Sequence, residues 1–209
     1  HLDPQIPRIP IPGGRRMTPQ ELTRDNIAAV ITTIFEKRSK DEYAGEAVTV
    51  AEHMLQGAHL ATTAGESEEI VAAALLHDIG HFTGSLGMYD PGDKEDRHHD
   101  EAGAAFLEPF FPPVVVECVR LHVAAKRYLC ATDPAYFGKL SEASVHTLEL
   151  QGGPMSADEV AAFEQNPWHK EAVKVRLWDE EGKDPDMVVP GIRTYEALLQ
   201  RVADQAATT

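Results

Sequence analysis

The 209-residue sequence predicts an all-α protein that folds as a single helical bundle. Apolar residues recur at spacings of three and four, and no stretch shows the alternation of a half-buried strand. Capping residues, glycines and prolines divide the chain into about ten helical segments. A chain of this length forms one full core, whereas two domains would be cramped.

The N-terminal stretch is expected to lie outside this bundle. Residues 1–16, HLDPQIPRIPIPGGRR, are rich in Pro and Gly and have no helical period, so we interpret them as a disordered tag or leader before a domain at 17–209. The first helix is predicted from Thr18, because Thr-Pro-Gln-Glu matches a capped start with Pro in the first turn. Its apolar stripe comprises Ile27, Val30, Ile31, Ile34 and Phe35.

The next two helices carry the first residues with metal-binding chemistry. A helix from about Glu46 to Ala64, capped by Gly65, includes His53. The third is centred on VAAALLHDIGH, residues 71–81, whose apolar start predicts a buried helix that ends in His77 and Asp78. A charged residue is rarely buried unless it is paired or coordinated, so this pair indicates a site. Taken alone, such a pair is more often structural, either a hydrogen-bonded core histidine or a C-terminal helix cap.

The second half of the chain supplies further polar residues on predicted helices. A long loop, from Phe82 to about Arg97, is typical of a functional lid or a mobile segment. A His98-His99 doublet then opens a helix, and Pro112-Pro113 starts a longer one that carries His122 and Lys126. The remaining helices are SEASVHTLEL, one capped by Ser156, PWHKEAVKVRLWDEE, and one from about Ile192 to Gln205.

Charge and cysteine content limit the possible partners and location. A net charge of −15 argues against nucleic acid or an anionic membrane as partner, although a pocket can still bind an anion. No stretch has the length of a membrane span or the form of a secretory signal. Cys118 and Cys130 lie in helical stretches and are expected to be free thiols, which predicts a cytoplasmic protein.

Six metal-competent residues come from five predicted helices that a bundle can bring together. They are His53, His77, Asp78, His99 (or its neighbour His98), His122 and Asp179. Imidazole and carboxylate without thiolate suit Zn, Mn or non-haem Fe. Four of these residues would hold one metal, the histidines at 99 and 122 would supply a second, and the carboxylate at 78 could bridge the two.

The order H…HD…H…H…D around AALLHDIGH resembles the HD-domain superfamily of metal-dependent helical proteins. The segments RLHVAAKRYLC, KLSEASVHTLELQGG and VRLWDEE resemble the mixed-valent diiron oxygenases within it that cleave carbon–phosphorus bonds. This group is typified by the glycine-forming 2-amino-1-hydroxyethylphosphonate dioxygenase and includes N-trimethyl-specific relatives. The resemblance spans roughly Tyr43 to Lys183.

The resemblance implies a cofactor and a reaction. The same six residues would bind two Fe ions as an Fe(II)/Fe(III) pair, with Asp78 bridging and O2 as co-substrate. His99 matches better than His98, because the family has Gly four residues after this ligand, as Gly103 stands here. The implied substrate is an organophosphonate, a 1-hydroxy-2-(amino or trimethylammonio)ethylphosphonate. Its cleavage would release phosphate and either glycine or glycine betaine, and an upstream hydroxylase is the implied pathway neighbour.

Two cationic residues are in register with the expected ligands. Lys126 lies four residues after His122 and Arg176 three before Asp179, so each shares a helix face with a ligand. A guanidinium and an ammonium group suit a phosphonate. Without that register, both would be interpreted as solvated helix surface.

The resemblance assigns the remaining roles. Asp78, His81 and Lys126 would act in catalysis. The implied substrate-binding residues are Tyr43, Glu46, His81, Lys126, Ser144, His146 and Arg176, with Tyr43 and Glu46 at the amine end. A trimethylammonium group would favour aromatic faces, for which Tyr43, Phe82, Tyr89 and Trp178 are the candidates.

Two other functions remain open from the sequence. A metal-dependent HD-type phosphohydrolase needs only His53, His77, Asp78 and Asp179, so substitution of either His99 or His122 would leave its activity largely intact. A non-catalytic HD-like module that senses a small anion would bind its ligand without turnover.

Overall fold

The computed structural model describes residues 9–10, 16–17, 21–83 and 94–206, and the all-α prediction is confirmed. Its strands are two residues long each and pair antiparallel, Ile9–Pro10 (β1) with Arg16–Met17 (β2). The described α-helices are α1 Ile27–Lys37, α2 Val50–Thr63, α3 Glu68–Leu76, α4 Gly80–Thr83, α5 His99–Leu107, α6 Pro113–Thr132, α7 Glu142–Leu150, α8 Ala157–Glu164, α9 His169–Glu181 and α10 Glu196–Gln205. The described residues also form short 3-10 helices at Phe137–Lys139 and Ile192–Thr194. None of the described helices is long and apolar enough to span a membrane.

The first helix begins later than predicted. α1 starts at Ile27, and residues 24–26 form a turn; residues 18–20 lie outside the described part of the chain. The Asn26 side chain accepts a bond from the Thr23 amide at 2.9 Å and donates one to the Glu21 carbonyl at 3.0 Å. Such local side-chain bonds compete with the helical ladder, so the prediction of a helix from Thr18 is wrong over the described residues.

The second helix also starts later, at Val50 rather than Glu46. Thr49 and Glu52 form a capping box there, in which each side chain accepts a hydrogen bond from the other residue's amide. This exchange satisfies two amides that would otherwise lack partners at the helix start. The predicted end is confirmed, since Gly65 adopts a φ of +75°, the left-handed conformation common just after a helix.

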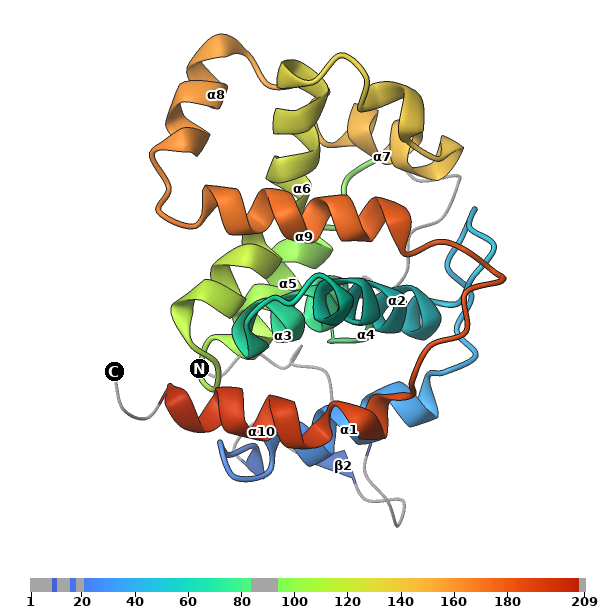
Figure 1. Cartoon of the computed structure of the whole chain (residues 1–209), viewed down its shortest axis with the longest axis vertical. Helices are drawn as coiled ribbons and strands as arrows, with labels where there is room; N and C mark the ends of the chain where they lie inside the picture. The colour runs from blue at the N-terminus through green and yellow to red at the C-terminus, as the bar shows by residue number, and fades with distance from the viewer. Residues whose placement is uncertain (1–8, 11–15, 18–20, 84–93, 207–209) are drawn as a thin grey trace.

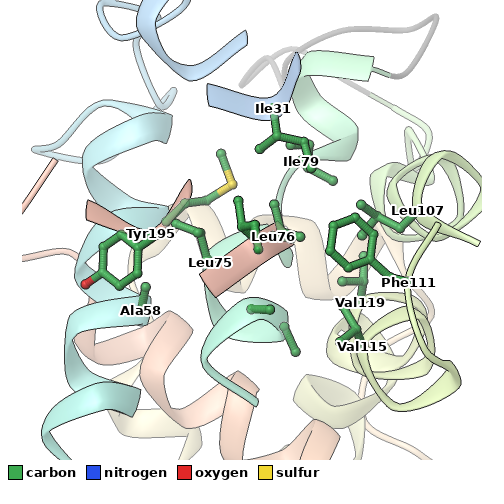
Figure 2. Close-up of a cluster of buried hydrophobic side chains, with 14 of the residues drawn as sticks. Ile31, Ala58, Leu75, Leu76, Ile79, Leu107, Phe111, Val115, Val119 and Tyr195 are labelled. Carbon is green, nitrogen blue, oxygen red and sulfur yellow. The ribbon is translucent and has the colours of Figure 1, made fainter. Parts of the chain in front are cut away.

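α3 is the central element of the core. Its residues from Ile70 to Leu76 are all buried, and it contacts α2, α6, α9 and α10. Figure 2 shows Leu75 and Leu76 among side chains contributed by the surrounding helices. A helix that is apolar on every face has to be surrounded in this way. The position of its C-terminal end, where His77 follows, is therefore set by packing on all sides.

The other helices surround α3 in tiers (Figure 1). α1 and α10 lie side by side at one end of the molecule, and α2 lies beside α3. α9 packs on both α2 and α6, while α7 and α8 lie at the opposite end from α10. The centre of the molecule is thus the place where helices from both halves of the sequence meet.

The turn after α3 depends on a close backbone contact. A Cβ atom at Gly80 would lie 1.8 Å from the carbonyl oxygen of His99, so only glycine fits where α4 meets α5. This approach stacks the His81 and His99 rings, with centroids 4.3 Å apart and an interplanar angle of 13°. Phe82 and Thr83 belong to α4, so the predicted loop does not start at Phe82; residues 84–93 lie outside the described part.

Candidate metal centre

The six metal-competent residues converge at the centre of the bundle and form two groups. His53, His77 and Asp179 make one group; Asp78, His99 and His122 make the other. Within each group, one ligand atom per residue lies within 4.8 Å of the others. α2, the end of α3, the turn after it, α5, α6 and α9 each contribute one residue. The structure therefore provides two adjacent sites suited to metal ions.

Asp78 joins the two groups. Its Oδ1 lies 3.2 Å from His99 Nε2 and 3.3 Å from His122 Nε2. Its Oδ2 lies 3.4 Å from His53 Nε2 and 3.6 Å from His77 Nε2. Each carboxylate oxygen thus faces a different histidine pair, which is the arrangement that a carboxylate bridging two metal ions requires.

Backbone carbonyls determine which nitrogen of three of these histidines is available. Nδ1 of His77 lies 2.7 Å from Ala74 O, Nδ1 of His122 2.7 Å from Val119 O, and Nδ1 of His53 2.8 Å from Gly182 O. Since a carbonyl only accepts, each Nδ1 carries the hydrogen, and the neutral ring then presents a bare Nε2. Such bonds hold metal-binding imidazoles in orientation.

The contacts between these rings fit a cation. His53 Nε2 and His77 Nε2 lie 2.9 Å apart, although both Nδ1 atoms already donate elsewhere. Within the described chain, Asp78 Oδ2 and Asp179 Oδ1 are buried and accept no hydrogen bond. Two lone pairs and two buried carboxylate oxygens facing one point repel each other unless a proton or metal ion lies between them. The donor set of imidazole and carboxylate suits non-haem Fe, Mn or Zn.

The protonation of the metal-free cluster follows from burial and neighbouring charge. Burial lowers the pKa of His77 to about 4. Burial also acts to lower that of His53, but the Asp179 and Asp78 carboxylates outweigh it and raise the pKa to about 9. Despite burial, histidine and arginine neighbours hold the pKa of both carboxyls well below the usual range. At neutral pH, His53 therefore carries a proton that a metal ion has to displace.

A cavity opens on one side of this cluster. Asp78, His99, His122 and Asp179 line it, whereas His53 and His77 lie behind them. The other walls come from the connector before α2, from α6, α7 and α9, and from residues 95–97. The cavity therefore reaches both metal groups through their carboxylates, but the ligand histidines that line it belong to the second group.

Two buried cations face this cavity. Lys126 Nζ donates to Thr147 Oγ1 at 2.9 Å and to Ser144 O at 3.4 Å. Burial, followed by the Arg176 charge, lowers the pKa of Lys126 to about 7. Arg176 donates from Nε to the Tyr136 hydroxyl at 2.8 Å, and its other two nitrogens pair with Asp179 and Glu180. The alternative interpretation as solvated helix surface is wrong, because the two side chains are buried.

The structure brings most of the other predicted substrate residues to the cavity. Tyr43, Glu46, His81 and Ser144 line it together with the two cations. His81 Nε2 lies 3.8 Å from Asp78 Oδ1. His146 does not line the cavity. It lines a separate surface pocket on α7, because it lies two residues from Ser144 and so projects from another side of the helix.

The predicted aromatic candidates separate in the same way. Tyr43 lies against the His53 ring, at a centroid distance of 4.8 Å, and lines the cavity. Phe82 and Trp178 pack into the hydrophobic core and do not line the cavity, and Tyr89 lies outside the described residues.

Of the histidine doublet, His99 joins the metal group, whereas the His98 side chain is 70% exposed and pairs with Asp96.

Sequence reasoning missed several polar residues around the cavity. Thr147 lies one turn after Ser144, Glu180 is four residues after Arg176, and Lys183 is four residues after Asp179. The helical register that singled out Lys126 therefore also contained a signal for Thr147 and Glu180, whereas Lys183 lies beyond the end of α9 at Glu181. Tyr136, which accepts the bond from Arg176, lies in a turn after α6 and carries no such signal.

Comparison with known proteins agrees with this arrangement. The model of the HD domain matches residues 50–180. The chain is 57% identical over 185 residues, 88% of its length and 94% of the relative's, to the [1-hydroxy-2-(trimethylamino)ethyl]phosphonate dioxygenase (glycine-betaine-forming) of Leisingera caerulea. It is 44% identical over 178 residues, 81% of its length and 86% of the relative's, to the hydroxymethylphosphonate dioxygenase of Gimesia maris. The chain therefore belongs to the HD-domain family, as its H…HD…H…H…D pattern predicted.

Proposed function

We propose that this protein is a diiron dioxygenase that cleaves the carbon–phosphorus bond of 1-hydroxy-2-(trimethylammonio)ethylphosphonate, releasing phosphate and glycine betaine. The observation that carries the proposal is the bridging position of Asp78, whose two oxygens face two histidine pairs beside a wall that bears Lys126 and Arg176. The identity to the Leisingera caerulea enzyme favours the trimethylammonium substrate over the amine.

The reaction balances without an external reductant. One O2 and one 1-hydroxyphosphonate give a carboxylate, a phosphate and a proton, because both oxygen atoms enter the products. The electrons that reduce O2 come from the C1–H and C1–P bonds. When bound, two iron ions held by the six proposed ligands supply the Lewis acidity and one-electron chemistry for this oxidation.

The protein's own residues position the substrate. Lys126, Arg176 and Ser144 bind the phosphonate through charge-assisted hydrogen bonds. Tyr43 and Glu46 lie at the amine end, where the Tyr43 ring offers a face to the trimethylammonium group. His81, beside Asp78, holds the proton of the 1-hydroxyl group. Fixing both ends of the substrate directs C1 toward the cluster.

The test is anaerobic reconstitution with iron, followed by exposure to O2 with the substrate, its 2-amino analogue and hydroxymethylphosphonate. We expect O2 uptake and phosphate release in equal amounts, fastest with the trimethylammonium compound. If the protein instead releases phosphate from a phosphomonoester without O2, and a His99→Ala variant keeps this activity, the protein is a phosphohydrolase. Binding of these phosphonates without turnover under any metal would establish a sensing module.

A further inference from the structure

Lys183 lies just outside the cavity and connects three of its walls. Its ammonium group is 3.1 Å from Glu46 Oε1, 3.7 Å from Glu180 Oε1 and 3.0 Å from Ser144 Oγ. The nitrogen also lies 6.0 Å from the centroid of the Tyr43 ring. These partners come from the connector before α2, from α7 and from α9. One cation thus contacts residues at both proposed ends of the substrate.

The carboxylates that Lys183 contacts are themselves buried. The side chains of Lys183, Glu46 and Glu180 are each at most 9% exposed. Glu46 also accepts a bond from Ser141 Oγ at 2.6 Å, and Glu180 pairs with Arg176. Charges at this depth are weakly screened, so each of them contributes to the potential inside the cavity.

Loss of Lys183 would leave two carboxylates with fewer cations to balance them. Glu180 would then be neutralised by Arg176 alone, and it would compete with a phosphonate for that guanidinium. Glu46 would carry an uncompensated negative charge at the amine end. The negative charges of Glu180 and Glu46 would then both repel a bound anion. The charge of Glu46 would also attract the cationic group of a zwitterion, which lies at the end opposite the phosphonate.

We infer that Lys183 is a positioning residue that sets the charge specificity of the cavity by neutralising Glu46 and sharing Glu180 with Arg176. With Lys183 present, the amine end has no net charge, so the site binds a phosphonate whether or not it carries a cationic group. Without it, the cavity favours zwitterionic phosphonates over simple ones. This inference rests on the proposed function, because it requires a phosphonate beside Lys126 and Arg176.

The test compares two ligands that lack the 1-hydroxyl group. Methylphosphonate has no cation, and 2-(trimethylammonio)ethylphosphonate is a zwitterion. Their dissociation constants are measured by calorimetry on the iron-loaded protein without O2. In Lys183→Met, we expect methylphosphonate to bind about tenfold more weakly and the zwitterion to lose less than about threefold. Adding Glu46→Gln to this variant should restore the wild-type ratio of the two constants.

The ratio of the two constants separates charge specificity from a general structural role. Lys174→Met is the matched control, since Lys174 lies on α9 and forms a surface pair with Glu66; its ratio should equal that of the wild type. An equal loss of affinity for both ligands, or no change, would overturn the inference. Failure of the wild type to bind either ligand would also overturn it, whereas the proposed function stands or falls on O2-dependent phosphate release.

Discussion

The two metal groups differ in how they face the cavity. In the first group, His53 and His77 are buried behind the cavity lining, and their Nδ1 atoms bond to Gly182 and Ala74 carbonyls. In the second group, both His99 and His122 line the cavity, and the His99 side chain is 15% exposed. The deep group is built like part of the core, whereas the second group is placed to meet small molecules. We therefore expect metal retention to depend more on the first group and ligand exchange more on the second.

Removing the residue that both groups share should have the largest effect. In Asp78→Ala, each group loses a carboxylate oxygen, so we expect metal content to fall from two ions per chain to fewer than one. Activity should drop by about a thousandfold or more. Elemental analysis after anaerobic reconstitution, together with the O2-uptake assay, measures both. Retention of two ions would show that Asp78 does not bridge them.

The difference between the groups predicts unequal effects of two histidine substitutions. His53→Ala removes a cationic partner from two buried carboxylates, so the metal-free protein should lose about 3 kcal/mol of unfolding free energy at pH 7. His99→Ala, at a partly exposed position, should cost about 1 kcal/mol while still abolishing oxygenase activity. Urea unfolding of both variants provides the comparison. Equal destabilisation would remove the distinction between a core-like and a cavity-facing group.

The cavity wall should show a pH dependence that comes from Lys126. Its pKa of about 7 means that it is charged below neutral pH and loses its proton as the pH rises. Phosphonate binding by the charged form should therefore weaken about tenfold between pH 7 and 8.5, seen as a rise in KM. Lys126→Arg keeps its charge and serves as the control. A parallel rise in KM in that variant would assign the titration to another group.

A substitution that removes no member of either group should have the smallest effect. Thr49→Ala removes the N-terminal cap of α2, the helix that carries His53, and should cost about 1 kcal/mol of unfolding free energy. Metal content and KM should stay unchanged, because the His53 amide one turn later bonds to the Thr49 backbone carbonyl, which the substitution keeps, and packing already holds the helix. Loss of metal in this variant would mean that the position of His53 depends on the helix start.

The sequence by itself determined the features that are local along the chain. Ser156 caps a helix where predicted, Gly65 ends one, and the apolar run before His77 forms the central helix. These signals operate within about four residues, so they can be read without knowing the fold. The H…HD…H…H…D order could be recognised through its resemblance to the HD-domain superfamily, and four of its ligands, His53, His99, His122 and Asp179, lie on helices that bring them inward.

Only the tertiary structure decided how these faces meet. His53 bonds to the carbonyl of Gly182, 129 residues away, and Lys183 joins Glu46 to Glu180. The direction of each Asp78 oxygen and the place of His146 outside the cavity depend likewise on helix packing. Such contacts join residues that are distant in sequence and leave no periodic signal, because their geometry follows from side-chain packing across helices rather than from spacing within one.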